Sequence, residues 1–395
     1  MKLILSFFVS LPIVVFFIPT IRIANLPLRL EDIFLIISLL IIINSSLLSS
    51  KLINRAFYCT FVLLLIVILT SLIEWSSSDD INFKSLIFGF TFIKYILWSV
   101  IVFSFKEKII DKRDLIIKVV IISFILQLMI AIFQKFNIFG FASGFPYHFV
   151  IKYYAIPNIY ATSTDLQSLA ATHMNFAFRP AGIVGSSTVT GMSLLILGLF
   201  IYKETGRYIF RLLTIFSLVL TFAKIAILSF IVIEIIYPLI RGDREKFKMI
   251  AFEALAISPV FFYLIIELGV YDNLIRLIDG SDRGVTHRSD VIEYVFNQDI
   301  LYILFGNYSS LPFSAFDSGV LLTIFRHGLI YFVIQYVVIL LLFLAFSRDF
   351  NNAFTSLLLI FFADLTFGSV YNPVFSNVIL LLFVLLTIIR NERET

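Results

Sequence analysis

Long apolar runs, separated by short polar segments, recur along the whole chain. A helix that crosses a membrane needs about 20 mostly apolar residues. The run Tyr208–Ile240 is too long for one helix, so we divide it near Ala223–Lys224. The pattern predicts about twelve transmembrane helices, or about eleven if that run stays whole. The other predicted spans are Leu3–Pro19, Ile33–Leu48, Ala56–Ile73, Ser85–Phe105, Leu115–Phe139, Gly182–Tyr202, Met249–Val270, Gly319–Phe346, Ala353–Phe367 and Val374–Ile389.

The composition agrees with an all-α protein that crosses a membrane many times. Hydrophobic residues make up 60% of the chain and charged residues 14%, and the mean hydropathy is +1.02. Soluble domains have about 25% charged and 45–50% apolar residues, so this chain could not hide its apolar excess in one soluble core. Its one cysteine, Cys59, excludes a disulfide within the chain and a cysteine-based metal site.

The distribution of Lys and Arg predicts the orientation, because short cytoplasmic loops carry an excess of both. With the N-terminus in the cytoplasm, the short outer loops hold only Arg22, Arg29, Lys84 and Lys224, and the inner loops hold far more. Dividing the run Tyr208–Ile240 at Lys224 preserves the excess of Lys and Arg in the inner loops. An even number of spans then returns the C-terminus to the cytoplasm. The first run lacks a small-residue cleavage site, so we interpret it as a retained span rather than a signal peptide.

Two long segments, 140–181 and 271–318, interrupt the series of spans, and both fall on the predicted outer face. Long loops in a compact protein usually carry function. The sequence has no internal repeat, no Gly/Ser linker and no low-complexity tract. We therefore predict a single transmembrane domain, 1–395, with two elaborated outer loops.

Candidate binding residues lie in and beside these two loops. Arginine suits phosphate, because its planar guanidinium binds oxyanions bidentately and stays charged. Arg179 stands at the mouth of a span and is followed by Gly182, Gly185 and small hydroxyl residues, and glycine lets other groups approach the backbone closely. The alternative interpretation of the segment after Arg179 is a face of small residues for helix packing. The alternative interpretation of the charged loop residues is a solvated surface of mixed charge. The other candidates in the loops are His173, Arg276, Arg283, His287 and Arg288.

The segment Gly284–Phe296 predicts an amphipathic helix on the outer surface, because Val291, Ile292, Val295 and Phe296 recur at helical spacing. Three functional patterns are absent from the sequence, namely a P-loop, HExxH and Asp-x-Asp. ATP hydrolysis, a zinc site and a metal-bound nucleotide donor are therefore not expected.

Few ionisable residues fall inside the predicted spans, and Lys94, Glu234 and Asp364 are the main ones. Each such group costs roughly 2.5–3.5 kcal/mol at the centre of a helix. They could couple transport to protons or ions. Snorkelling and structural ion pairs are commoner explanations for such groups, and we favour these.

Four short patterns follow one another in the second half of the chain. Arg179 and Gly182 form an Arg-x-x-Gly that leads into a span, and Lys224 follows at the division of the long run. The second outer loop then carries Arg288, an amphipathic segment and Gly306.

The last pattern is the polar pair Asp317-Ser318, which opens a span that continues to Gly328-Leu329. In these features, from Arg179 to Tyr331, and in its size and span count, the chain resembles the O-antigen polymerase and ligase superfamily of bacterial envelope proteins. It departs from that family in two places. Ala223-Lys224-Ile225 replaces Ser-Arg-Gly and keeps only the positive charge, and Asp317 stands where ligases usually have histidine.

The resemblance implies a GT-C-like membrane fold and a glycosyl transfer at the outer leaflet, in which a growing glycan leaves undecaprenyl diphosphate and joins the next lipid-linked repeat unit. The diphosphate is a good leaving group, so the enzyme needs cations that hold its developing charge, and the acceptor hydroxyl needs a base. Arg179, Arg288 and Lys224 are the implied cations, and Asp317 or His287 is the implied base. No metal or cofactor is expected. The further candidates for binding the diphosphate or the glycan are Lys224, Arg276, Arg283, Arg326 and His173.

Asp317 favours a polymerase of surface polysaccharide, such as the O-antigen of lipopolysaccharide, over a ligase that joins finished polymer to its acceptor. The alternative from another class is a flippase for the same lipid-linked sugars, which would line a central cavity with charges and keep its loops short. The expected partners are a lipid-linked oligosaccharide, membrane lipid and a chain-length regulator protein, with no nucleic acid. The expected location is the bacterial inner membrane.

We predict that Arg288→Ala abolishes chain extension while protein levels stay normal, because a cation that holds the leaving diphosphate is lost. Gel profiles of the surface polysaccharide, read beside an immunoblot of the protein, measure both quantities. Normal chain lengths in this variant would remove Arg288 from the mechanism.

Overall fold

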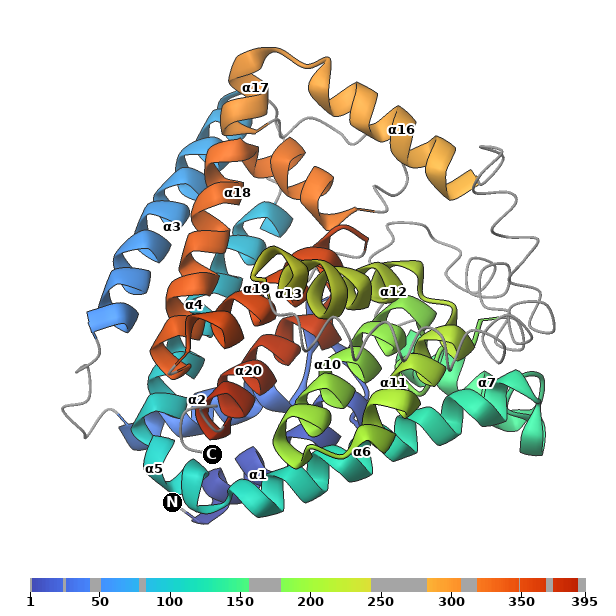
Figure 1. Cartoon of the computed structure of the whole chain (residues 1–395). Helices are drawn as coiled ribbons and strands as arrows, with labels where there is room; N and C mark the ends of the chain where they lie inside the picture. Colours follow the sequence, from blue (N-terminus) through green and yellow to red (C-terminus); the bar gives the residue numbers. More distant parts are fainter. Residues whose placement is uncertain are drawn as a thin grey trace. The chain divides into compact units, whose positions relative to one another are not determined.

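The computed structural model of the chain describes residues 2–23, 26–42, 51–77, 83–155, 179–242, 283–306, 318–347, 349–366 and 372–389. This part is mainly helical (Figure 1). It also holds a short antiparallel hairpin of β1 (Ile21–Ile23) and β2 (Leu26–Leu28), in which Ile21 pairs with Leu28. The chain divides into two compact units. The first unit comprises Met1–Val120, Pro157–Thr164 and Asp290–Thr395, and the second comprises Ile121–Ile156 and Asp165–Ser289.

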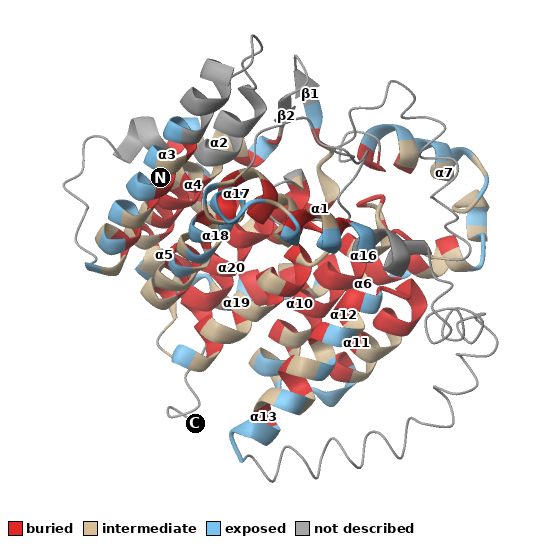
Figure 2. Ribbon diagram, turned by 90° about the horizontal axis from the view of Figure 1, so that it is seen from above, coloured by how far each residue is buried: buried red, intermediate tan, exposed pale blue. Residues whose placement is uncertain are grey.

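A deeply buried helix, α20 (Pro373–Ile388), forms the core of the first unit. It is buried from Val374 to Ile388, as Figure 2 shows in red, because its sequence is apolar on all sides. Helices from both ends of the chain pack around it. These are α1 (Lys2–Phe17), α4 (Phe83–Ser104), α5 (Lys106–Asp111), α18 (Gly319–Phe346) and α19 (Phe350–Asp364).

The long helix α18 lies along α3 (Lys51–Ser77) in the first unit (Figure 1). The other side of α3 exposes large apolar side chains, among them Phe57, Phe61, Leu65 and Leu69. An apolar surface of this kind is expected where a helix faces lipid. The remaining helices of this unit are α2 (Leu30–Ile42), which packs on α1 and α4, and α17 (Ile300–Phe305), which packs on α18.

The second unit is built around α10 (Ser187–Thr205), which packs closely against two neighbouring helices. A Cβ atom added to Gly198 would lie 1.9 Å from Oγ1 of Thr214, and one added to Gly191 would lie 2.3 Å from Cβ of Ala223. Small residues at these positions let the backbones approach, as is common between membrane helices. The neighbours are α11 (Tyr208–Thr221) and α12 (Lys224–Ile231), and α12 continues through η3 (Val232–Ile236) into α13 (Tyr237–Ile240).

Other helices of the second unit come from the middle of the chain. The helix α6 (Arg113–Lys135) begins in the first unit and continues into the second. It is followed by η1 (Ile138–Gly140), α7 (Phe145–Val150) and η2 (Ile151–Ala155), which lie within or beside the first predicted outer loop. The helix α16 (Arg283–Phe296) lies in the second predicted outer loop, and it begins in the second unit and ends in the first, which starts again at Asp290.

Helices occur at most of the predicted spans. Among the described residues, Lys51–Leu69, Arg113–Lys135 and Gly319–Phe346 are long and apolar enough to cross a membrane. The expectation of a helical, membrane-embedded protein is therefore supported, whereas the number of spans stays a prediction. The predicted span Met249–Val270 lies outside the described residues. Shorter apolar helices occur at Lys2–Phe17, Thr91–Ser104, Tyr208–Thr221, Phe350–Asp364 and Val374–Ile388.

The predicted division of the run Tyr208–Ile240 is confirmed as a break between two helices. The helix α11 ends at Thr221, and Phe222 adopts the left-handed conformation with φ 47°. The helix α12 then begins at Lys224. With 14 residues, α11 is about 21 Å long, which is shorter than a hydrocarbon core of about 30 Å.

A second break, inside α18, was not predicted from the sequence. Gly328 has φ 86° and ψ 164°, which separates Gly319–His327 from the rest of the helix. The end of α17 fits against this break. A Cβ atom added to Gly306 would lie 2.2 Å from the carbonyl oxygen of Arg326, and one added to Gly328 would lie 2.2 Å from that of Leu304. Glycine at both positions therefore allows α17 and α18 to touch backbone to backbone.

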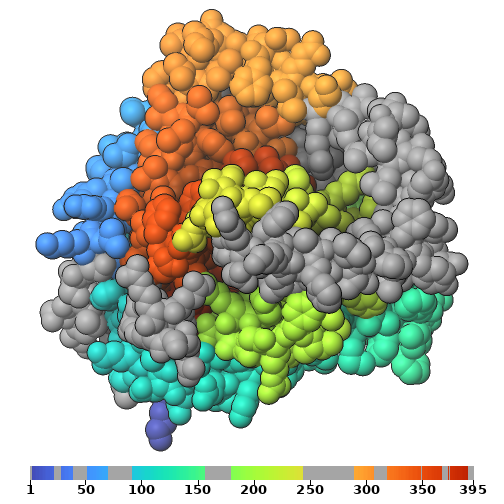
Figure 3. All heavy atoms as spheres, in the orientation of Figure 1, coloured from blue at the N-terminus to red at the C-terminus, as the bar shows by residue number. Residues whose placement is uncertain are grey.

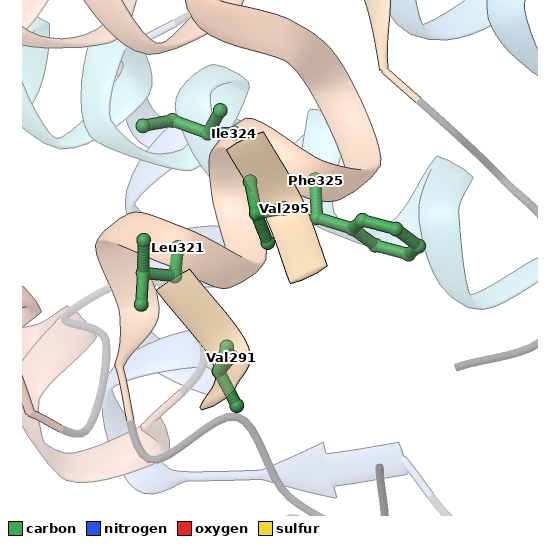
Figure 4. Packing of buried hydrophobic residues seen from close by; sticks show 5 residues of the cluster. All are labelled: Val291, Val295, Leu321, Ile324 and Phe325. Atoms are coloured by element: carbon green, nitrogen blue, oxygen red, sulfur yellow. The ribbon is translucent and has the colours of Figure 1, made fainter. Parts of the chain in front are cut away.

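The predicted amphipathic helix is present as α16, but only half of its predicted apolar face is buried. Val291 and Val295 pack against Leu321, Ile324 and Phe325 of α18, as Figure 4 shows. The other two members of that face, Ile292 and Phe296, are exposed, because they lie about 100° further round the helix.

Gly306→Ala is expected to lower stability more than Gly206→Ala does. Both glycines have positive φ, but a Cβ atom at Gly206 meets nothing within 4 Å, whereas one at Gly306 meets backbone. The conformational strain is about 1–2 kcal/mol at Gly206, which is left-handed helical, and at least as large at Gly306, whose φ of 96° and ψ of 158° lie in a region that essentially only glycine adopts. The overlap adds about 1–3 kcal/mol at Gly306. Thermal unfolding in detergent, followed by tryptophan fluorescence, measures the difference. Equal melting temperatures for the two variants would contradict the contact between α17 and α18.

Candidate functional site

Arg179 precedes a tight turn, Ala181–Gly185, whose backbone is held by a side chain of α6. The amide of Gln134 donates from Nε2 to the carbonyl oxygen of Gly182 and accepts at Oε1 from the backbone N–H of Ala181, both at 2.9 Å. Gln134 is fully buried. The hydroxyl of Thr190, in the first turn of α10, donates to the carbonyl oxygen of Ala181. The turn is therefore fixed to both α6 and α10.

A second glutamine of α6 supports the same turn. The Oε1 atom of Gln127 accepts from the backbone N–H of Ile183 at 3.3 Å, and its Nε2 atom is buried with no hydrogen-bond partner in the described part of the chain. Gly182 has φ +58°, and a Cβ atom there would lie 2.6 Å from Oε1 of Gln127. The close approach expected at Gly182 is therefore present, and the groups that approach are side chains of α6 and α10.

The contacts of α10 bring Lys224 to the same end of this helix as Arg179. Gly191 directly follows Thr190, which binds the turn after Arg179. Gly191 also faces Ala223, the residue before Lys224. Lys224 is exposed and is the first residue of α12. Two cations thus flank the first turns of α10, both within the second unit.

This arrangement suits an anion. The N-terminus of a helix carries a partial positive charge, and α10 begins at Ser187, directly after the turn. Arg179 is half-buried, and its guanidinium supplies a permanent charge with bidentate geometry. A phosphate or another oxyanion is the chemical group that such a combination favours.

The other predicted site residues lie elsewhere or outside the described residues. Arg326 is in α18 of the first unit and is half-buried. Ser318, the second residue of the polar pair, caps α18 by accepting from the N–H of Leu321 at 3.3 Å. The backbone of three predicted residues belongs to α16, and their side chains are outside the description; these are Arg283, His287 and Arg288. Outside the described residues altogether lie His173, Arg276 and Asp317.

Sequence analysis missed Gln127 and Gln134, which do most to shape the turn. Their spacing, i and i+7, places them on one face of an otherwise apolar helix. Two amide side chains on one face of a predicted span are the signal that could have identified them, because a buried amide needs hydrogen-bond partners.

The ionisable groups predicted inside the spans of the first unit have polar partners. Nζ of Lys94 lies 2.5 Å from Oδ1 of Asp32. The hydroxyl of Tyr336 donates to Oδ2 of Asp364 at 2.5 Å. Lys94 is therefore in an ion pair, as the favoured interpretation expects.

The third such group, Glu234, forms a buried ion pair with Arg211 in the second unit. The Arg211 guanidinium also lies 5.3 Å from the ring centre of Tyr202 and 5.6 Å from that of Phe230. Arg211 lies inside α11 and is almost fully buried. Glu234 therefore also has an ion-pair partner.

Comparisons with known proteins give no assignment. No protein-family model, no curated protein and no solved structure matches the chain. What the protein does is therefore inferred from its own motifs and contacts.

Glu234→Ala is expected to lower stability by about 3–5 kcal/mol, because it leaves the Arg211 charge buried without its carboxylate. Replacing both partners, as Arg211→Met with Glu234→Leu, should recover most of this loss. Glu107→Ala, at an exposed glutamate of α5, is the control and should stay within about 0.5 kcal/mol of the wild type. Thermal unfolding in detergent compares the variants, and a double variant as unstable as Glu234→Ala would contradict a purely structural pair.

Proposed function

We propose that the protein is a membrane glycosyltransferase that polymerises a surface polysaccharide. It transfers a growing glycan from undecaprenyl diphosphate to the next lipid-linked repeat unit at the outer leaflet. Three features support this: the apolar helices, the motifs shared with the O-antigen polymerase and ligase superfamily, and the two cations beside the start of α10.

The pair of cations at α10 is the observation that carries the proposal. Arg179 and Lys224 are the positions that the family resemblance assigns to binding of the diphosphate, and the contacts of Thr190 and Gly191 draw their segments to one end of a helix. A leaving diphosphate gains negative charge as the glycosidic bond breaks. Fixed cations stabilise this charge without reorganisation, which is how enzymes lower such barriers most effectively.

The proposed reaction needs one bond to break and one to form. A hydroxyl at the non-reducing end of the incoming repeat unit attacks the anomeric carbon of the growing glycan, and its proton passes to Asp317 or His287 as the base. The bond from the anomeric carbon to the diphosphate oxygen breaks with its electron pair. The lipid diphosphate leaves as an anion, held by Arg179, Lys224 and Arg288. No nucleotide is consumed.

Pairing of the intramembrane charges favours this enzyme over a flippase. A transporter needs ionisable groups that change partners during its cycle. Lys94 is paired with Asp32, and Glu234 is paired with Arg211. These contacts support a structural role for both groups.

Arg179→Gln is expected to reduce polymerisation by about 10²–10³-fold, the usual effect of removing one group that stabilises a developing oxyanion. Arg207→Gln is the matched control, because Arg207 is an exposed arginine beyond the opposite end of α10. Each variant is expressed in a strain that lacks the gene, and surface polysaccharide and lipid-linked sugars are resolved on gels. The polymer ladder should collapse to a single repeat unit for Arg179→Gln and persist for Arg207→Gln.

The strain without the gene separates the competing functions. Loss of the ladder with single units on their anchor indicates a polymerase. Full-length polymer stranded on the lipid carrier indicates a ligase, and single units trapped at the inner leaflet indicate a flippase. An unchanged profile would contradict all three functions, and a normal ladder for Arg179→Gln would remove Arg179 from the site.

A further inference from the structure

The short helix α17 presents an almost continuous apolar surface. Ile300, Leu301, Tyr302 and Phe305 are 64%, 62%, 51% and 49% exposed, and none of the six residues of α17 is charged or buried. Its first turn is fixed by Asp299, whose side chain accepts from the N–H of Leu301 at 2.9 Å. The surface is therefore held on a regular helix and does not belong to a loose loop.

The apolar surface continues onto the last turns of α16. Ile292 and Phe296 are exposed there, on a different face from Val291 and Val295, which pack on α18. Glu293 and Asp290 are also exposed and lie on a third face of the same helix. Figure 3 shows the atoms of α16 and α17 together beside α18 at one end of the view. Exposed apolar patches of this kind usually mark contact with a membrane or a protein.

The contact with α18 sets the level of α17 relative to the membrane. The end of α17 touches α18 at Gly328, where that helix is broken. The part of α18 beyond the break, Leu329–Phe346, is roughly 27 Å long at 1.5 Å per residue, close to the hydrocarbon thickness of about 30 Å. A crossing by Leu329–Phe346 would place the break at one end of the hydrocarbon core, with α17 beside that end.

The exposed surface of α18 begins at the same place. Leu329 and Ile330 directly follow the break and are exposed, and Val333 and Val337 continue the same apolar surface along the helix. An apolar surface on a membrane-crossing helix is covered by acyl chains. Because the end of α17 contacts Gly328, the exposed residues of α17 lie next to this surface and would meet the same medium.

We propose that α17 and the exposed apolar residues at the end of α16 insert into the boundary between lipid head groups and acyl chains. The occupant of this surface is bilayer lipid. Tyr302 suits that depth, because tyrosine is enriched at membrane interfaces, and the exposed acidic residues of α16 remain in water. Helices that combine an apolar and a charged face bind membranes in this way.

Insertion of α17 would hold α16 at the height of the lipid head groups. The backbone of Arg288 belongs to α16, so a phosphate of a lipid carrier would lie at the level of this helix. The insertion itself is independent of the proposed reaction, because it rests on the exposed surface and on the contact at Gly328. A protein that is no polymerase would still insert α17.

Site-directed spin labelling of the full chain in lipid vesicles tests this. The chain has one cysteine, so Cys59→Ser gives a background without thiols. A nitroxide is attached to a single cysteine at Leu301 or Phe305, in vesicles of phosphatidylethanolamine and phosphatidylglycerol. Its collision rates with oxygen, which concentrates in acyl chains, and with a water-soluble nickel chelate are compared. Oxygen collisions should exceed nickel collisions severalfold at both positions.

Two reference positions calibrate the result. A label at Val337 of α18 reports the acyl-chain environment, and a label at Glu293 of α16 reports water. The quantity compared is the ratio of the oxygen collision rate to the nickel collision rate. Ratios at Leu301 and Phe305 that lie close to the ratio at Val337 support insertion. Ratios equal to that of Glu293 would overturn it, since α17 would then face water. Low collision rates with both reagents would also overturn it, because a second copy of the chain would then cover the helix.

Discussion

Backbone N–H and C=O groups at membrane depth must find partners within the protein, because lipid offers none. Helices satisfy this requirement internally, so each interruption of a helix needs a local substitute. The described part of the chain has such interruptions at Phe222–Ala223, at Gly328 and at the turn Ala181–Gly185. How each of them is satisfied determines where polar side chains and cations gather.

The turn after Arg179 shows this most fully. Its free backbone groups are met by the amide of Gln134, the amide of Gln127 and the hydroxyl of Thr190. These side chains hold the backbone in one conformation, and a fixed backbone fixes the residue that precedes it. Replacing a single buried glutamine by an apolar residue would leave backbone groups unsatisfied, each at a cost of about 1–3 kcal/mol. The position of the arginine therefore depends on polar residues within an apolar helix.

Apolar periodicity and length were enough to predict most of the helices, because a membrane imposes one simple requirement on each span. The break at Phe222–Ala223 followed from the excess length of the run and from Lys224. The break at Gly328 was missed, because the span Gly319–Phe346 was drawn from the length of an apolar run and a single glycine is tolerated within a helix. The polar residues Arg326 and His327 directly precede the break. At the break Gly328 meets the backbone of Leu304, and Arg326 meets Gly306, so the contact joins segments that are separated in the sequence.

Contacts between residues that are distant in the sequence also limited the prediction of the candidate site. A cation next to a glycine-containing segment suggested Arg179, but the residues that hold the turn belong to a different helix and were recognised only from contacts. Val291, Ile292, Val295 and Phe296 were predicted as one apolar face of α16, because spacing defines a stripe and does not show how much of its width a neighbour covers. The stripe on α16 is wider than the surface that α18 offers, so part of it stays exposed.

The break between α11 and α12 links the intramembrane charges to the requirement that each interruption of a helix be satisfied within the protein. Arg211 and Glu234 stand at equal distances in the sequence on either side of Phe222–Ala223, so their pairing closes the two helices into a hairpin. A buried ion pair contributes little net stability, because desolvation offsets the attraction, but a mismatched register would leave both charges buried and unpaired. The ion pair therefore mainly determines the register of α12 against α11. By fixing how α12 lies against α11, it fixes the height of Lys224 at the tip of the hairpin, beside the start of α10. A charge pair near one end of the hairpin thus positions the cation at the other end.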